Sequence, residues 1–273
     1  MNQKCQSEIL RSGTDSLAQQ YDEYLGPLFF EPYAMDVANL IDPSVVSNAL
    51  EIGCGTGRVT RHLSNILSPN ASLVASDISQ DMLAVAKEKL RNRNIEWKII
   101  DAENLPIETD SVDLVVCYFG YMFVPDKAKA FAEALRVLRK GGMLLMATWD
   151  TLEHNEASHV FRKTVEKCFG ETLPESSKVA SSMHDPAANA QMLQLAGFSK
   201  INSFRVVKKM HAETAASAAQ GLVKGGSLYN EILKRNPAWV DEIISTVEKE
   251  LSEKYGKGPM IAPISAIITQ GWK

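Results

Sequence analysis

The feature that most constrains this fold is a regular alternation of strand-like and helix-like segments between residues 48 and 150. Short apolar runs occupy residues 48–52, 71–77, 95–100, 112–119 and 143–149. The segments between them space their apolar residues as amphipathic helices do. Strands and helices that alternate in this way predict an α/β fold, in which helices cover both faces of a mostly parallel sheet.

Local signals support individual elements of this pattern. Ser79 is a good N-cap for the helix that follows it, and Asp81 would complement the helix dipole in the first turn. The run "VDLVVCYF" is almost continuously apolar, as expected for a strand covered on both faces. The pair Gly141–Gly142 is expected to end the helix that begins near Asp126.

Two mostly helical regions flank the alternating core, which predicts three parts. Residues 1–47 form an N-terminal helical segment with the aromatic cluster "YDEYLGPLFFEPYA", and residues 48–150 form the core. Residues 151–273 supply cap helices and the last two strands, at 198–210 and 259–273. A helical insertion between two late strands can cover the sheet edge where ligands bind.

The composition fits a soluble globular protein. The chain has 273 residues, of which 45% are hydrophobic and 23% charged, and its net charge is −4. This net charge disfavours a nucleic-acid partner. Four cysteines without metal-ligand spacing indicate a reducing compartment and no metal site. The N-terminus lacks an apolar signal region, and no run reaches the ~18 residues of a membrane span, so we expect a cytoplasmic protein.

A glycine-rich turn follows the first apolar run and ends a segment that reads "ALEIGCGTGRVT". Gly53, Gly55 and Gly57 alternate over five positions. Missing side chains let a ligand approach the backbone closely. The dinucleotide fingerprint G-x-G-x-x-G would place its third glycine at position 58, which is Arg58. The pattern therefore departs from that of an NAD-dependent enzyme by one residue.

Two carboxylates follow the next two strands at equal spacing. Asp77 lies 24 residues after Gly53, and Asp101 lies 24 residues after Asp77. In an open α/β sheet, ligands bind beyond the carboxyl ends of the strands. Asp77 is placed to accept both hydroxyls of a ribose, a role shared with NAD sites, and Asp101 is placed to meet an adenine amino group. The spacing therefore indicates a nucleoside site.

Together these motifs resemble one family. The stretches "LEIGCGTGRVT", "ASDIS", "DAENLP", "DSVDLVVCYFGYMFVPD" and "LRVLRKGGMLLMATW" are similar to those of class I S-adenosylmethionine-dependent methyltransferases. The subgroup that they resemble most contains the ubiquinone/menaquinone-biosynthesis C-methyltransferases. The resemblance implies a doubly wound seven-stranded sheet whose last strand runs antiparallel between the fifth and sixth.

The resemblance also implies S-adenosyl-L-methionine as cofactor and a role for each matching residue. Gly53, Cys54 and Gly55 would let the backbone approach the methionine part. Asp77 would hold the ribose, Ile78 and Met82 would pack beside the adenine, and Asp101 and Ala102 would meet its edge. Cys117 and Tyr118 would line the floor near the sulfonium, and Tyr21 would close over the cofactor. Glu51, at the end of the first strand, completes the expected cofactor-binding set.

The implied reaction transfers a methyl group to a small or medium organic molecule by in-line displacement. Aromatic faces suit a sulfonium charge, and Tyr118, Phe119, Tyr121 and Phe123 follow the fourth strand. Core packing explains Phe119 and Phe123 equally well. The sequence identifies no catalytic residue, although His154, His159, His184 and His62 are the histidines considered as a base.

Two other functions stay open at this point. A non-catalytic S-adenosylmethionine-binding protein would keep the same motifs. An NAD-dependent oxidoreductase is disfavoured by the shifted third glycine. The sequence leaves open the identity of the methyl acceptor, which could be a quinone precursor, a phenol, an amine, or a fatty or amino acid, and also the oligomeric state.

Overall fold

A seven-stranded sheet forms the centre of the computed structural model, which describes residues 16–173, 175–226 and 228–273. The strands, in chain order, are β1 (Asn48–Ile52), β2 (Ser72–Asp77), β3 (Glu96–Ile99), β4 (Val112–Tyr118), β5 (Leu138–Trp149), β6 (Ile201–Ala212) and β7 (Met260–Trp272). Their spatial order is β3-β2-β1-β4-β5-β7-β6, in which β7 pairs antiparallel with both β5 and β6. This topology confirms the expected fold class, including the antiparallel last strand.

The five strands β1 to β5 are parallel, so their carboxyl ends meet at one edge of the sheet. β1 lies between β2 and β4, and its residue Glu51 stands opposite Ala75 and Val116. All seven residues of β4 are buried, as its continuous apolar run predicts. Chain order reverses beside β1, which brings the glycine turn to the point where open α/β sheets bind ligands.

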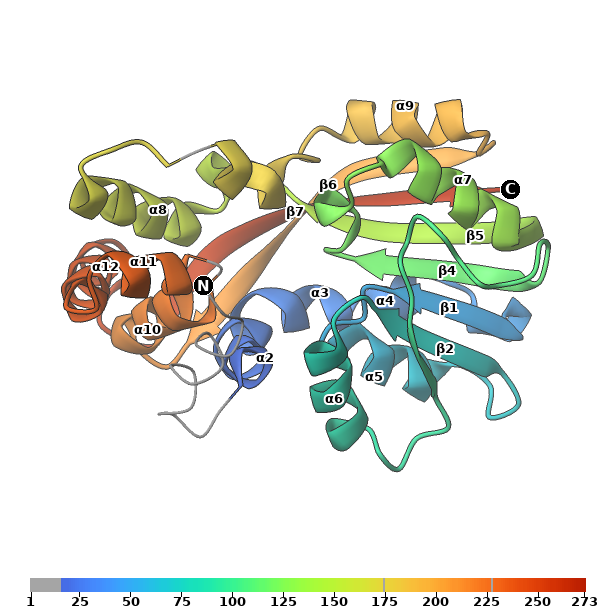
Figure 1. Cartoon of the computed structure of the whole chain (residues 1–273), viewed down its shortest axis with the longest axis horizontal. Helices are drawn as coiled ribbons and strands as arrows, with labels where there is room; N and C mark the ends of the chain where they lie inside the picture. Colours follow the sequence, from blue (N-terminus) through green and yellow to red (C-terminus); the bar gives the residue numbers. More distant parts are fainter. Residues whose placement is uncertain (1–15, 174, 227) are drawn as a thin grey trace, which may run out of the picture.

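Helices flank this sheet (Figure 1). The core helices are α5 (Arg58–Ile66), α6 (Gln80–Lys89), α7 (Lys127–Val137) and α9 (Pro186–Ala196), and the short 3-10 helix η4 spans Tyr121–Phe123. Ser79 caps α6 by accepting a hydrogen bond from the Met82 amide, as expected from the sequence. α7 and α9 pack against each other, whereas α5 packs against the N-terminal helices.

One boundary differs from the sequence-based expectation. The helix expected to reach Gly141 ends at Val137, and β5 begins at the next residue, Leu138. Leu138 is fully buried and pairs with Val112 at the start of β4. A buried position in the sheet therefore outweighs the helical spacing that runs through Leu138, and Gly141 lies within the strand at a φ of 81°.

The N-terminal segment is mostly helical between residues 17 and 45, with breaks at residues 35–36 and 41–42. It consists of α2 (Leu17–Gln20), the π-helix η2 (Tyr21–Phe30), α3 (Glu31–Ala34), α4 (Val37–Leu40) and the 3-10 helix η3 (Pro43–Val45). Ser16 starts α2 with a capping box. Residues 1–15, which include Cys5, were also expected to be helical, and they lie outside the described residues.

A helical lobe lies at one end of the sheet and is reached by the long β6–β7 pair (Figure 1). It contains α8 (Glu156–Phe169), α10 (Ala215–Gly225), α11 (Tyr229–Arg235) and α12 (Trp239–Tyr255), and η2 packs against α10. The 3-10 helices η5 (Leu152–His154) and η6 (Glu175–Ser181) connect this lobe to the sheet. None of the described helices combines the length and apolarity that crossing a membrane requires.

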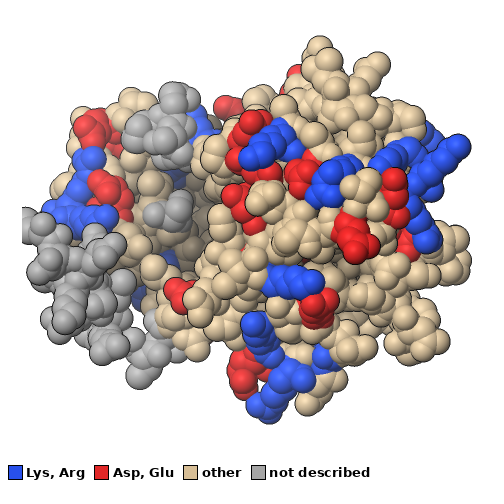
Figure 2. Space-filling view, turned by 45° about the vertical axis from the view of Figure 1, so that its right-hand side comes forward, with Lys and Arg blue, Asp and Glu red and all other residues tan. Residues whose placement is uncertain are grey.

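The face of the molecule in Figure 2 is hollowed between this lobe and the sheet. Acidic and basic side chains are interspersed over the rest of that face. The hollow is the natural place to look for a binding site, because it adjoins the carboxyl ends of the parallel strands.

Candidate functional site

A cavity of 770 Å³ lies at the carboxyl ends of the parallel strands. The sheet supplies one wall, the π-helix η2 a second wall, and α8, η6 and α10 a third. The cavity wall contains all twelve residues expected to bind the cofactor: Tyr21, Glu51, Gly53, Cys54, Gly55, Asp77, Ile78, Met82, Asp101, Ala102, Cys117 and Tyr118. Residues predicted from separate motifs therefore converge on one space.

The glycine turn requires glycine at each of its three positions. Gly53, Gly55 and Gly57 have φ values of 66°, 54° and 81°, which strain other residues. A Cβ at Gly55 would meet no protein atom within 4 Å, whereas one at Gly57 would lie 3.1 Å from Ala86 of α6. Gly57 therefore serves helix packing, and Gly55 leaves backbone exposed to the cavity.

Asp77 is held in position by the turn itself. One carboxylate oxygen accepts a hydrogen bond from the Gly55 amide at 2.8 Å, and the other accepts one from the Ser79 amide at 2.8 Å. Each oxygen has a second lone pair that can still accept a donor. The carboxylate is thus fixed at the cavity wall and keeps the capacity to bind two hydroxyl groups.

The neighbouring residues form a half-open rim. Ile78 is 71% exposed although it is a large apolar residue, and Met82 is partly buried beside it. Asp101 is exposed and accepts a hydrogen bond from the Glu103 amide, whereas Ala102 is buried. An exposed apolar side chain in a cavity wall that also contains two carboxylates offers a face on which a planar ring can pack.

Glu51 is a buried carboxyl group at the floor of the cavity. It is 2% exposed, and its Oε2 atom has no hydrogen-bond partner in the described part of the chain. Burial raises its pKa to about 8, so the group is mostly protonated at neutral pH. A buried polar atom without a partner is costly, and its presence beside a cavity points to a ligand that supplies the partner.

The two cysteines of the site, Cys54 and Cys117, are protonated thiols and therefore do not act as thiolate nucleophiles. Burial raises the pKa of Cys117 to about 12, and it also raises the pKa of Cys54 well above the ordinary value. Neither residue is therefore ionised at neutral pH. Their small side chains fit the role of packing beneath a ligand.

An aromatic wall lines the cavity with residues from the ends of β4 and β5 and from η2. The rings of Phe119 and Trp149 stack with their centroids 3.9 Å apart and their planes 17° apart. Phe30 of η2 packs against both, at 5.5 and 5.6 Å, and Tyr21 lies 5.1 Å from Phe30. Phe119 also has a φ of 60°, which is an unusual backbone conformation for a bulky residue. Strained conformations of this kind are often found at functional sites.

The expected aromatic set is only partly placed in this wall. Tyr118, Phe119 and Phe123 line the cavity, whereas Tyr121 is fully buried in the core against Phe131. Trp149 and Phe30 were not among the expected site residues. Trp149 ends the fifth apolar run, and that position is the one sequence signal that could have identified it.

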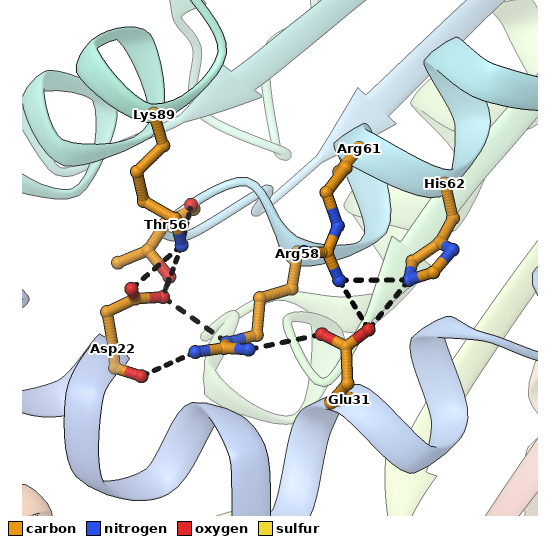
Figure 3. A network of polar contacts seen from close by, with 7 residues as sticks. All are labelled: Asp22, Glu31, Thr56, Arg58, Arg61, His62 and Lys89. Carbon is orange, nitrogen blue, oxygen red and sulfur yellow. Dashed lines mark hydrogen bonds and ion pairs between the residues drawn. The ribbon is translucent and has the colours of Figure 1, made fainter.

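A network of charged residues fastens the N-terminal segment to the glycine turn (Figure 3). Asp22 accepts hydrogen bonds from Thr56 and Lys89, and its backbone carbonyl accepts one from Arg58 at 2.6 Å. Arg58 also pairs with Glu31 at 3.1 Å. Glu31 further contacts Arg61 and His62.

Burial opposes ionisation of Asp22 and Glu31, but the hydrogen bonds of Lys89 to Asp22 and of His62 to Glu31 lower their pKa values below the usual range. Both residues are therefore ionised partners that hold η2 and α3 over the turn. The network also explains Arg58, the residue that departs from the dinucleotide pattern.

None of the four histidines considered as a base lies in the cavity wall. His62 contacts Glu31, His154 pairs with Asp150 at 3.0 Å, and His184 bonds to the Ser181 carbonyl. His159 is partly buried on α8. Within the described ranges, no three His, Cys, Asp or Glu side chains gather as a metal site.

Comparisons with known proteins agree with this geometry. A family model described as "Methyltransferase domain" matches residues 50–146. The chain is 30% identical to the demethylmenaquinone methyltransferase of Staphylococcus haemolyticus over 200 residues, 68% of this chain and 84% of the relative. It is 31% identical to the ubiquinone/menaquinone biosynthesis C-methyltransferase of Pasteurella multocida, over 70% of this chain and 78% of the relative.

The chain belongs to the class I S-adenosylmethionine-dependent methyltransferases. The resemblance drawn from its motifs is confirmed, and the glycine turn is that of a methyltransferase rather than of an NAD-dependent oxidoreductase. The chain is also 30% identical to the ubiquinone/menaquinone biosynthesis C-methyltransferase of Shewanella halifaxensis. This match covers 56% of the chain and 66% of the relative, which is just under two thirds of the relative's length.

Solved structures share the fold of this methyltransferase. The YcgJ protein of Bacillus subtilis has a TM-score of 0.58 and 17% identity, with 88% of this chain and 98% of that chain covered. An S-adenosylmethionine-dependent methyltransferase from Aquifex aeolicus has a TM-score of 0.51 and 16% identity, with 72% and 94% covered. At these identities the likeness shows the common architecture only.

Proposed function

We propose that this methyltransferase binds S-adenosyl-L-methionine along the ends of β1, β2 and β3 and methylates a small or medium organic molecule held beneath the cap. The observation that supports it most is the Asp77 carboxylate, which the Gly55 amide orients into the cavity beside open backbone. The cofactor, when bound, supplies a methyl group activated on a sulfonium. Core residues 48–150 would hold it, residues 1–47 would cover it, and residues 151–273 would choose the acceptor.

The residues present fit this cofactor. Asp77 offers two oxygens to the ribose hydroxyls, and the exposed side chain of Ile78, with Met82, offers an apolar face to the adenine. Asp101 and Ala102 would meet the adenine edge. The unpartnered Glu51 oxygen would accept a hydrogen bond from the ammonium of the methionine part, near Gly53 and Cys54.

The remaining residues position the reaction and exclude water. Cys117 and Tyr118 lie under the cavity floor, and Phe119 and Trp149 present aromatic faces, which stabilise a positive charge by ~0.5–2 kcal/mol. Tyr21 would close the cofactor end from η2. Correct alignment of donor and acceptor lowers a barrier by ~7–11 kcal/mol, so positioning by these walls is the main catalytic contribution that we propose.

Thermal melting tests the cofactor assignment directly. Binding of S-adenosylmethionine or S-adenosylhomocysteine at 100 times Kd is expected to raise Tm by roughly 5–10 °C, and NADH is expected to leave it unchanged. A rise with NADH alone would overturn the assignment. Release of labelled methyl groups to a panel of phenols, carbon acids, amines and carboxylates then tests turnover, and its absence would favour a non-catalytic binding protein.

A further inference from the structure

The two ends of the cavity differ in the ionisable residues that line them. The carboxylates of Asp77 and Asp101 and the mostly protonated Glu51 lie at the strand ends where we place the cofactor, together with Arg58, which is paired with Asp22 and Glu31. The cap brings basic residues to the other end. They come from three separate segments, namely α8, η6 and α10, and are Arg162, Lys178 and Lys224.

Asp150 directly follows β5 and is the acidic residue that lines the cap end of the cavity among the described residues. Its carboxylate oxygens already accept several hydrogen bonds from the protein. Its carboxylate accepts hydrogen bonds from Arg205 at 2.5 Å, from Ser265 at 2.7 Å and from the Thr151 amide at 2.8 Å. Its side chain is 0% exposed. It therefore has little capacity to neutralise a ligand cation, which disfavours an amine as the acceptor.

The basic residues differ in what they contact. The Arg162 side chain is 9% exposed, pairs with Glu166 at 3.2 Å and bonds to the Leu173 carbonyl. Lys178 also has interaction partners. Lys224, at the end of α10, makes no hydrogen bond or ion pair with any residue in the described ranges. Among the described cap residues that line the cavity, Lys224 is thus the basic residue whose ammonium is available to a ligand.

Apolar residues also line the cap end of the cavity, beside polar ones such as Ser158 and Asn230. Phe161 of α8, Leu222 of α10 and Leu228 line the same cavity as the stacked pair of Phe119 and Trp149. A lysine beside apolar and aromatic walls suits a molecule with an apolar body and one anionic group. Pairing the ammonium in such a partly desolvated place is more favourable than pairing it at an open surface.

We infer that the acceptor is an aromatic or similarly apolar organic anion, whose body packs on Phe119 and Trp149 and whose charged group pairs with Lys224. This inference rests on the proposed function, because it identifies the molecule that the cap would hold beside the cofactor. It selects the organic acids from the acceptors that the sequence left open, and it makes Lys224 a specificity-determining residue.

Two probes that differ in one charged group test this inference. The probe 1-anilinonaphthalene-8-sulfonate is an aromatic anion, and N-phenyl-1-naphthylamine has the same aromatic body without the sulfonate. Their fluorescence is titrated with the protein saturated with S-adenosylhomocysteine, so that only the acceptor end is free. The wild-type protein is expected to bind the anion at least 10-fold more tightly than the neutral probe.

Three variants separate the charge of Lys224 from general changes in the protein. Lys224→Met is expected to abolish the preference for the anion and to leave the affinity for the neutral probe within about 2-fold. Lys224→Arg is expected to retain the preference. Lys249→Met, on the exposed face of α12 outside the cavity, is the matched control and should behave as the wild type. Unchanged Tm values confirm that each variant is folded.

The outcomes distinguish this inference from the proposed function. If S-adenosylhomocysteine binds but Lys224→Met keeps the full preference for the anion, the inference is wrong and the cofactor site stands. If S-adenosylhomocysteine does not bind, the proposed function fails, and the same titrations on the protein alone still decide whether Lys224 selects anions. Equal affinity of the wild type for both probes would overturn the inference in either case.

Discussion

The guanidinium of Arg58 lies against Gly26, in the space that a side chain at position 26 would occupy. Gly26 belongs to the π-helix η2, whereas Arg58 begins α5 directly after the glycine turn. The contact allows Arg58 to reach the Asp22 carbonyl and the Glu31 carboxylate at the same time. The missing side chain at position 26 thereby lets the N-terminal segment pack over the glycine turn.

We expect Gly26→Ala to reduce the free energy of unfolding by about 1–2 kcal/mol, because the new Cβ displaces a mostly buried guanidinium from its carboxylate partners. In an Arg58→Met background the same change should be neutral or stabilising by up to ~1 kcal/mol, since alanine favours a helix interior over glycine. Urea unfolding of the four proteins in this cycle gives both values. The same destabilisation in both backgrounds would show that Arg58 is not the cause.

We expect Asp77→Ala to weaken the binding of S-adenosylhomocysteine by roughly 1.5–3 kcal/mol, measured by calorimetry, because the ribose loses its charged acceptor. Asp77→Asn should lose less, because one acceptor oxygen remains. Asp81→Ala is the control, because Asp81 is an exposed carboxylate in the first turn of α6, four residues after Asp77, and does not line the cavity. An unchanged affinity of the alanine variant would refute the ribose assignment.

We expect the free energy of unfolding to depend on pH because of the buried Glu51 carboxyl group. Burial raises its pKa from 4.5 to about 8 in the folded protein, so the folded state binds the proton more tightly than the unfolded state does. The resulting stabilisation is complete below pH 4.5 and is lost as the pH rises towards 8. Glu51→Gln removes this titration. The stability of the variant relative to the wild type should therefore increase between pH 5 and pH 8 by on the order of 2–4 kcal/mol.

Urea unfolding at several pH values measures this difference. Glu88→Gln, which changes an exposed glutamate paired with Arg91, should show no such trend. A constant difference between the Glu51→Gln variant and the wild type across the range would mean that Glu51 is ionised in the folded state.

Asn155 joins the cap to the sheet, and we expect Asn155→Ala to cost about 2–4 kcal/mol of stability. Its amide nitrogen donates to the carbonyls of Thr151 and Ser265 at 3.0 Å each, and its oxygen accepts from the Ser265 amide at 2.9 Å. The residue is 5% exposed, so water cannot replace these bonds. Thermal or urea unfolding measures the loss, with the exposed Asn70→Ala as control; a loss below 0.5 kcal/mol would contradict the prediction.

The sequence by itself determined the order of strands and helices, the glycine turn and the two carboxylates that follow the next strands. These features depend on local rules, because hydrophobic periodicity and short motifs record how each segment is buried and which backbone must stay open. Asp77 and Gly55 are 22 residues apart, yet both were placed correctly at the cavity, since the ends of parallel strands meet at one edge. The binding role of each residue stays a prediction.

Only the tertiary structure decided which residues from distant segments share a wall. The stack of Phe119 on Trp149, the position of Arg58 against Gly26 and the opening of Lys224 to the cavity join segments that no local pattern relates. The early end of α7 has the same origin, because burial of Leu138 beside Val112 outweighed its helical spacing. Local periodicity records which side of a segment is buried, but the neighbour against which it is buried depends on the packing of the whole chain.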